Sequence, residues 1–314
     1  MNPQDRFIII FGGSGSVGRA LQKLFKEKNI NHTTPSHGEF DLLDDRAIGR
    51  LMESYRHIDP KDMVWINLAA KKTNISANSE DPLGIYNDTI RIYQNFYAGA
   101  HRYNVGKVIG VVSSCCYPFN LDILSEDKID SGPTHISVEP HGAAKRECWR
   151  LSKFYRQQYG LNSSIICWNN LYGGWDEKSE KYLKVADSLI KRIVEAKMNN
   201  VPVVDVWGDG SPRREFLHHI DAAKSIIRFL EVDSNTELIN IGSGGDISIY
   251  DLSYLIKHLA GYQGSIEFLS EMPNGQMKKL LDVSLMKKLL NWEPGISLED
   301  GLKRTINWYK ERLI

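Results

Sequence analysis

Three features are missing from this chain: long apolar runs, cysteines at metal-ligand or disulfide spacing, and an excess of charge of either sign. The 39 basic and 39 acidic residues cancel, which argues against a general nucleic-acid binder because such a protein carries a basic excess. No apolar run approaches the length that crosses a membrane. The four cysteines predict neither a metal site nor a disulfide framework.

The remaining composition is that of an ordinary globular protein. With 42% hydrophobic and 25% charged residues in 314, the chain predicts a sizeable core and one large or two closely joined domains. The first six residues lead straight into an apolar stretch, so we expect no signal peptide. We therefore expect a soluble cytoplasmic protein with reduced thiols. A homodimer is the default expectation for its assembly.

The strongest local pattern is at residues 7–18, where an apolar stretch meets three glycines. Five apolar residues at 7–11 predict a strand buried on both faces. Gly12, Gly15 and Gly18 follow, and the next apolar residues recur at helical spacing. Such glycines allow a sharp turn, close approach to a pyrophosphate and close packing of the helix on the strand. We interpret this stretch as a dinucleotide-binding turn; the alternative is a glycine-rich turn without a ligand.

The second strand, expected near residues 30–34, bears on the choice of cofactor. Folds of this kind that bind NAD usually end this strand with Asp or Glu, which holds the ribose 2′-hydroxyl. Here residues 33–37 read TTPSH, without a carboxylate. This favours NADP(H) over NAD(H). No arginine stands there to hold a 2′-phosphate, so Ser14 and His37 would be the weaker donors.

Strand-like and helix-like segments alternate along the rest of the chain. Strands are expected at 63–70, 108–112, 162–166, 203–207 and 238–241. Helices are expected to start at 44 and 81 and to cover 141–159, 183–197, 222–230, 249–259 and 298–309. This alternation predicts an α/β fold, a Rossmann-type doubly wound parallel sheet with a smaller C-terminal substrate-binding lobe. We place the dinucleotide-binding domain at 1–174 and the lobe mainly at 175–314, with crossings back to the main sheet left open.

Candidate reactive residues follow the expected strand 108–112. Ligands of such sheets bind outside the carboxyl ends of the strands, so Ser113 and Cys115 should face the same crevice as the glycines. On the following helix, His141 and Lys145 are four residues apart and therefore share one face.

A glycine turn, a serine at the end of a later strand and a lysine on the next helix together resemble the extended short-chain dehydrogenase/reductase superfamily. Within it, the chain resembles the GDP-L-fucose synthase family over nearly its whole length. The stretches that carry the resemblance are SSCCYP at 113–118, EPHGAAK at 139–145, NLYG at 170–173, VWG at 206–208, REFLH at 214–218, KLLDV at 279–283 and ISLE at 296–299.

The resemblance implies transfer of a hydride from NADPH to the C4 ketone of a GDP-bound hexose or heptose, in the biosynthesis of a capsule or surface polysaccharide. Ser113 would hydrogen-bond the ketone oxygen, and Lys145 would bind the nicotinamide ribose and lower the pKa of the neighbouring acid. No metal is implied. The residues implied for cofactor binding are Gly12, Ser14, Gly15, Ser16, Val17, Gly18, His37, Asp41, Leu42, Ala69, Lys145 and Asn169.

The resemblance also implies a set of residues for the GDP-sugar. Arginine forks suit pyrophosphate oxygens, and an indole offers a flat surface for stacking. The alternative for each Arg or Lys is a solvated surface charge, and the alternative for the tryptophan is core packing. The implied residues are Ser114, Asn170, Lys184, Arg192, Trp207, Arg214 and Lys279.

The chain departs from the family at the proton donor. The family places a tyrosine four residues before the lysine, and this chain has His141 there. An imidazolium could supply the proton, because an unperturbed histidine titrates near about pH 6.5, but Lys145 would lower that pKa. We expect His141 to donate the proton or to position the donor. The alternative is a spectator role, with Ser113 and water sufficing.

A second departure concerns epimerisation at C3 and C5, which the family performs with a cysteine base and a histidine acid. Cys115 matches the base, whereas Lys184 stands at the position of the acid. A lysine acts as an acid only with a strongly shifted pKa, so we expect epimerisation to be lost or weak. Cys115 would then line the pocket, and the bulky Trp168 would reshape it for another sugar.

Three alternative functions stay open. A full 3,5-epimerase/4-reductase would use Lys184 as its acid. A nucleotide-sugar 4-epimerase or dehydrogenase would keep its cofactor bound and consume no NADPH. A non-catalytic binder of nucleotide-sugars would have lost its activity with the tyrosine, although Ser113 and Lys145 argue against it because a mere binder does not need them.

Overall fold

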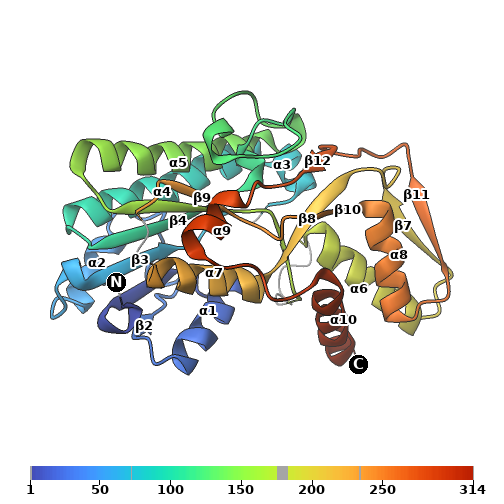
Figure 1. Cartoon of the computed structure of the whole chain (residues 1–314), viewed down its shortest axis with the longest axis horizontal. Helices are drawn as coiled ribbons and strands as arrows, with labels where there is room; N and C mark the ends of the chain where they lie inside the picture. The colour runs from blue at the N-terminus through green and yellow to red at the C-terminus, as the bar shows by residue number, and fades with distance from the viewer. Residues whose placement is uncertain (1, 72, 175–182, 233–234, 314) are drawn as a thin grey trace.

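A strand, a glycine turn and a helix near the start of the chain form the first unit of the main sheet (Figure 1). The computed structural model describes residues 2–71, 73–174, 183–232 and 235–313. Strand β1 covers Phe7–Phe11 and helix α1 covers Ser16–Glu27. The side chains of Ile8, Ile9 and Ile10 are fully buried, as the apolar run predicts for a strand covered on both faces.

Six parallel strands form the main sheet, in the order β2-β1-β3-β4-β5-β9. The predicted Rossmann-type α/β fold is confirmed. Because all strands are parallel, their carboxyl ends lie along one edge, where this class of sheet binds its ligands. Besides β1, the strands are β2 (His32–Thr33), β3 (Met63–Asn67), β4 (Lys107–Ser113), β5 (Ser163–Trp168) and β9 (Leu238–Ile241).

Helices cover both faces of this sheet (Figure 1). On one face α4 (Pro82–Arg102) packs against α5 (Glu139–Tyr159), and α2 (Ala47–Ser54) contacts α4. On the other face α1 packs against α7 (His219–Glu231). The connections contain α3 (Ile75–Glu80) and 3-10 turns at Pro3–Asp5, Pro60–Asp62, Ser114–Cys116, Glu126–Lys128 and Ile136–Val138.

A smaller group of strands and helices lies to one side of the main sheet (Figure 1). Its central strand β8 (Arg213–His218) pairs antiparallel with β10 (Asp246–Ser248) and parallel with β12 (Lys278–Lys279) and β6 (Asn170–Tyr172). Strands β7 (Val203–Trp207) and β11 (Ser265–Leu269) form a separate parallel pair. A second apolar core joins them to α6 (Val185–Met198), α8 (Ile249–Ala260) and α10 (Leu298–Leu313).

The chain returns to the main sheet after residue 175. Strand β9 pairs with β5, α7 packs on α1, and α9 (Ser284–Leu290) packs against β9. The segment 175–314 therefore supplies one strand of the large sheet, while the division at residue 174 stays a prediction. Within the described ranges, no helix combines the length and the apolar character needed to cross a membrane.

Several predicted boundaries are wrong, for local reasons. The strand predicted at 63–70 ends at Asn67, whose side chain accepts a hydrogen bond from the N–H of Ala69 and starts a turn. The helix predicted from residue 44 starts at Ala47, because Asp44 accepts from the N–H of Arg46 in a preceding turn. The helix predicted from residue 141 starts at Glu139, with a proline in its first turn, where the missing N–H costs nothing.

Strand β8 was not predicted at all. The run Arg213-Arg214-Glu215 follows a proline and reads as a solvated loop. In the structure Glu215 is fully buried, because its carboxylate is surrounded by hydrogen-bond donors. A buried charged residue is compatible with a strand only when its partners come from distant segments, and sequence periodicity does not reveal such partners.

Candidate active site

The backbone of the glycine turn lies so close to its neighbours that only glycine fits. Gly12 has a φ of 79°, and a Cβ added there would lie 2.5 Å from the N atom of Ala69. A Cβ on Gly18 would meet the backbone of Gly13 at 2.6 Å, so the start of α1 presses directly on the turn. The predicted cofactor residues of the turn and Ala69 are therefore brought together.

The first turn of α1 suits a pyrophosphate. Its N-cap is Gly15, no side chain caps it, and no acidic residue occupies the first turn. The backbone N–H groups of Ser16 and Val17 can therefore donate hydrogen bonds to an anion. The positive end of the helix dipole favours the negative charge of that anion. This backbone cradle fits the dinucleotide that the sequence predicts.

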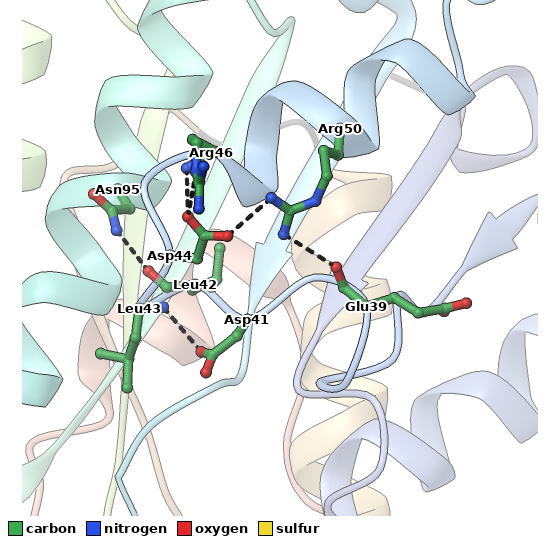
Figure 2. A network of polar contacts seen from close by, with 8 residues as sticks. All are labelled: Glu39, Asp41, Leu42, Leu43, Asp44, Arg46, Arg50 and Asn95. Atoms are coloured by element: carbon green, nitrogen blue, oxygen red, sulfur yellow. Dashed lines mark hydrogen bonds and ion pairs between the residues drawn. The ribbon is translucent and has the colours of Figure 1, made fainter.

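The turn that follows β2 is held by its own network (Figure 2). Asp41 accepts a hydrogen bond from the N–H of Leu43 at 2.9 Å, and Asn95 of α4 donates to the carbonyl of Leu42 at 2.7 Å. Leu42 is buried, whereas His37 is largely exposed and lies 3.6 Å from Asp41. The predicted cofactor residues Asp41 and Leu42 thus belong to one ordered turn beside β2.

Lys145 lies buried on α5, below the end of β4. Its Nζ donates to the carbonyl of Val111 at 3.1 Å and to the hydroxyl of Tyr93 at 3.3 Å. Burial lowers the pKa of Lys145. Ser113, the last residue of β4, accepts a hydrogen bond from the N–H of Cys115 at 3.4 Å, and its own O–H can donate to the Cys115 sulfur or to a ligand.

His141 lies one turn before Lys145 and is half-buried. Burial lowers its pKa well below 6.5, and the positive charges of Lys145, Lys184 and Lys279 lower it further. Its Nδ1 is buried without a hydrogen-bond partner in the described structure. The imidazolium that the sequence suggested as proton donor is therefore disfavoured at neutral pH, because neither burial nor these neighbours favours the charged form.

Positive charges surround Cys115. Lys279 Nζ lies 3.2 Å from its Sγ, and Lys184, whose Nζ donates to the carbonyl of Thr73 at 2.7 Å, adds a second nearby ammonium. Burial raises the pKa of Cys115, but Lys279, the Ser113 hydroxyl and Lys184 together lower it to about 7. The structure thus brings predicted catalytic and substrate residues into one cationic cluster, defined here as Cys115, Lys184, Arg214 and Lys279.

Arg214 completes this cationic cluster from β8. Burial lowers the pKa of Arg214 to about 10, and the nearby Cys115 opposes that shift. Its guanidinium donates to the carbonyls of Arg213 and Met277 at 2.8 and 3.4 Å. These are neutral acceptors, so the charge of the guanidinium remains available to an anionic ligand.

Three predicted binding residues, Ser114, Asn169 and Asn170, use their side chains for hydrogen bonds within the protein instead. Ser114 donates to Asn169 at 2.9 Å, and Asn169 donates to the Glu215 carboxylate at 2.9 Å. Asn170 donates to the Glu215 carbonyl at 2.9 Å. Glu215 also accepts from the N–H groups of Gly244 and Leu281, so these side chains join β5, β8 and the segment after β12.

Trp207 and Arg192 stand apart from the cationic cluster. Trp207 is 57% exposed at the end of β7, which excludes the core-packing alternative. Arg192 is half-buried on α6. No hydrogen bond or ion pair between described residues joins either of them to the cluster. Trp168 is buried in the core at the end of β5, paired in register with Ser113.

Sequence reasoning missed three neighbours of the site. Burial, Lys279 and Arg214 each lower the pKa of His135, so this histidine lies near the cationic cluster. Asn78 donates to the Thr73 hydroxyl at 2.8 Å and accepts from the N–H of His141 at 3.2 Å. Because the Thr73 carbonyl accepts from Lys184, Asn78 connects the residue that holds Lys184 to α5. Only the proximity of His135 to the predicted donor in the sequence could have drawn attention to it.

A parallel sheet with a glycine-built phosphate cradle, and a serine and a lysine beside it, defines a dinucleotide-dependent enzyme of the extended short-chain type. The chain belongs to the NAD dependent epimerase/dehydratase family, which matches residues 8–242.

Individual relatives show which enzymes of this family the chain is similar to. GDP-L-fucose synthase of Escherichia coli is 33% identical over 315 residues, covering 97% of this chain and 96% of that protein. Putative GDP-L-fucose synthase 2 of Arabidopsis thaliana is 32% identical, covering 98% and 92%. GDP-mannoheptose C4 reductase of Campylobacter jejuni, solved with NADP bound, superimposes with a TM-score of 0.85 at 26% identity and covers 98% and 99%. The expected resemblance is confirmed.

Proposed function

We propose that this protein is an NADPH-dependent C4 reductase of a GDP-4-keto-6-deoxy sugar, a hexose or a heptose. The observation that carries the proposal is the pairing of an intact dinucleotide cradle with Ser113 and Lys145, next to a cysteine whose neighbours are lysines. The enzyme is an oxidoreductase and its cofactor is NADP, as in the related heptose C4 reductase. Similarity to GDP-sugar synthases supports the GDP-sugar class of substrate.

Each residue near the ketone has a defined task. NADPH, when bound, supplies the hydride. The Ser113 hydroxyl donates a hydrogen bond to the C4 oxygen, and Lys145, held by Val111 and Tyr93, presents its remaining N–H to the nicotinamide ribose. The positive charge of Lys145 stabilises the negative charge that develops on the C4 oxygen.

His141 positions the proton donor in this proposal. A neutral imidazole can donate one N–H to a water or to the ketone oxygen, but it holds no extra proton to lose near neutral pH. His141 should therefore contribute no loss of rate as the pH rises from about 6.5 to 8, and His141→Ala should keep the shape of the pH profile. A rate that falls tenfold per pH unit over that range, and levels off in His141→Ala, would instead make the imidazolium the acid.

The surroundings of Cys115 argue against efficient epimerisation. Removing a proton from C3 or C5 requires a strong base, and a thiolate stabilised by Lys279 and Lys184 is a weaker base than a free thiolate. Lys184 is further held by the Thr73 carbonyl. We therefore propose that the sugar arrives at this enzyme with C3 and C5 already in their final configuration.

NADPH oxidation with GDP-4-keto-6-deoxymannose, with and without a separate 3,5-epimerase, tests this function. Turnover only with the epimerase supports a reductase that follows epimerisation. Turnover without it, giving an unepimerised 6-deoxy sugar, means a plain 4-reductase. Turnover without it that gives GDP-fucose, with solvent deuterium at C3 and C5, contradicts the proposal. Failure in both arms, followed by turnover of a GDP-4-ketoheptose, assigns the heptose.

The setting of the enzyme is part of the same proposal. We propose a cytoplasmic homodimer that acts in the biosynthesis of a capsule or surface polysaccharide, as the resemblance implies. Sedimentation of the purified protein would show whether it is a dimer.

A further inference from the structure

The end of β2 does not explain how this chain distinguishes NADP from NAD. Residues 33–37 contain neither a carboxylate, which would hold a free 2′-hydroxyl, nor an arginine, which would hold a 2′-phosphate. A phosphate group is recognised best by the planar fork of an arginine. A cation that serves this purpose must therefore come from another part of the chain.

Two arginines lie close to the turn that follows β2, Arg46 just before α2 and Arg50 on it, and both are already paired (Figure 2). Arg50 donates to the Asp44 carboxylate at 2.8 Å and to the Glu39 carbonyl at 3.3 Å, while Arg46 Nε lies 3.4 Å from the other Asp44 oxygen. The N–H of Arg46 and the guanidinium of Arg50 lower the pKa of Asp44 to about 2. The carboxylate therefore stays charged and keeps both arginines.

His37 is a poor substitute for these arginines. Its Nε2 lies 3.6 Å from an Asp41 oxygen, and its side chain is 85% exposed. Its ring also lacks the planar fork with which an arginine donates to two phosphate oxygens at once.

Arg19, on the second turn of α1, is a cation without an acidic partner. Its Nε donates to the carbonyl of Ser14 at 2.8 Å, which folds the side chain back over the glycine turn. In the described ranges no carboxylate pairs with Arg19, and the residue is exposed. Its terminal N–H groups are therefore available to a ligand beside the turn.

Gln22, three residues after Arg19 on α1, contacts the end of β2. Gln22 accepts a hydrogen bond from the Thr34 hydroxyl at 3.3 Å and donates to the carbonyl of Gly13 at 2.7 Å. A Cβ on Gly13 would lie 2.5 Å from the Thr34 side chain. The glycine turn and the end of β2 are thus in direct contact, and Arg19 is bonded to the same turn at the Ser14 carbonyl.

We propose that Arg19 holds the 2′-phosphate of NADP and that this contact gives the chain its preference for NADP(H) over NAD(H). Nε stays on the Ser14 carbonyl, and the terminal N–H groups donate to the phosphate oxygens. The exposed Ser14 hydroxyl adds a donor from the turn itself. The proposal rests on the NADP cofactor of the proposed function and is independent of the sugar.

Fluorescence titrations with NADPH and NADH test this role. Arg19→Ala should weaken NADPH binding by about 10- to 100-fold, as expected for lost charge-assisted hydrogen bonds. NADH binding should stay unchanged within about twofold. Arg19→Lys should restore part of the NADPH affinity, because lysine keeps the charge without the fork. Lys23→Ala is the matched control, one turn further on the same exposed face, and should change neither affinity.

Three outcomes would overturn the proposal. Equal losses for NADPH and NADH in Arg19→Ala would assign Arg19 to the shape of the turn. Unchanged NADPH affinity would leave the phosphate to His37. An equal loss in Lys23→Ala would mean that diffuse charge attracts the cofactor. Because these titrations contain no sugar, they succeed or fail independently of the reductase assay, and adenosine 2′,5′-bisphosphate provides a second probe for a variant that binds the dinucleotide too weakly.

Discussion

The cofactor end and the catalytic end of this site are built in opposite ways. The pyrophosphate cradle at the cofactor end is one continuous stretch, residues 12–18, which offers backbone N–H groups and space without side chains. The catalytic end collects side chains from β4 and its following turn, α5, the residue before α6, β8 and β12. Most of those side chains are charged or titratable, and they act on one another: Cys115, His141, Lys145, Lys184, Arg214 and Lys279.

The two ends should therefore respond differently to mutation and to pH. A backbone cradle depends on dihedral angles and close contacts, so one added methyl group disrupts it. A side-chain cluster depends on the charges of neighbours brought in from other segments, so its chemistry changes with pH and with mutations elsewhere in the cluster.

The largest effect is expected at the cofactor end. Gly12→Ala would place a Cβ 2.5 Å from the N atom of Ala69 at a φ of 79°, so β1 and β3 or the turn itself must move. NADPH binding should be lost at accessible concentrations in a fluorescence titration. Gly160→Ala is the control, because Gly160 also has a positive φ, 66°, but nothing lies near its Cβ. That control should lower the free energy of unfolding by about 1 kcal/mol and leave NADPH binding unchanged.

The next largest effect is expected at the ketone. Ser113→Ala should lower kcat by about 10²- to 10³-fold, the usual cost of removing a donor to a developing oxyanion, without changing NADPH affinity. Ser114→Ala is the matched control next to it, because Ser114 is buried and donates to Asn169. We expect it to lower the free energy of unfolding by about 1–2 kcal/mol with a smaller change in kcat. Similar kcat values for the two variants would contradict the role of Ser113.

A buried histidine at the end of β8 should make the protein sensitive to acid. Burial, and to a smaller extent the nearby His219, Arg304 and Lys224, lower the pKa of His218 to about 3. The unfolded chain takes up this proton near about pH 6.5 and the folded chain does not, so stability falls as the pH drops below that value. The loss from His218 should reach about 2 kcal/mol at pH 5.

Urea unfolding at pH 7 and pH 5 measures this loss. His218→Asn removes the titration but keeps a side chain able to cap α7, where His218 accepts from the N–H of Ile220. The variant should lose less stability between the two pH values than the unmodified protein. An equal loss in both would show that His218 does not carry the effect.

The smallest effect is expected at Trp207, which is exposed at the end of β7. Trp207→Ala should raise KM for the GDP-sugar about tenfold if the indole stacks on the nucleotide base. The free energy of unfolding should hardly change, since the ring is 57% exposed. Tyr254→Ala, another exposed aromatic residue in the same part of the chain, should leave KM unchanged. An unchanged KM in Trp207→Ala would remove it from the site.

The cofactor end was predictable because its information is local. The spacing of Gly12, Gly15 and Gly18 after an apolar strand specifies a turn, and the turn specifies where N–H groups point. The missing carboxylate after β2 correctly favoured NADP. The cation at α1 was not predicted, because Arg19 reaches the glycine turn only when its side chain folds back onto Ser14.

The catalytic end was predictable only as a set of candidates. Ser113, Cys115 and Lys145 were named and do lie near one another, but Ser114, Asn169 and Asn170 turned out to be bonded into the Glu215 network. The burial of Glu215 gave no signal in the sequence, since a run of two arginines and a glutamate looks like solvated surface. The charge state of His141 likewise depends on its burial and on three lysines from different segments.

The amino-acid sequence by itself determined the strand–turn–helix unit, the parallel α/β sheet and the family, because apolar periodicity and glycine spacing act between residues close in the chain. Only the tertiary structure decided which side chains stay available to a ligand and which charges they carry. Burial depends on distant segments, and the partners are also distant: the Glu215 carboxylate is 46 residues from Asn169, and the Lys279 ammonium is 164 residues from Cys115. Desolvation and Coulomb interactions follow distance in space, which the order of residues does not specify.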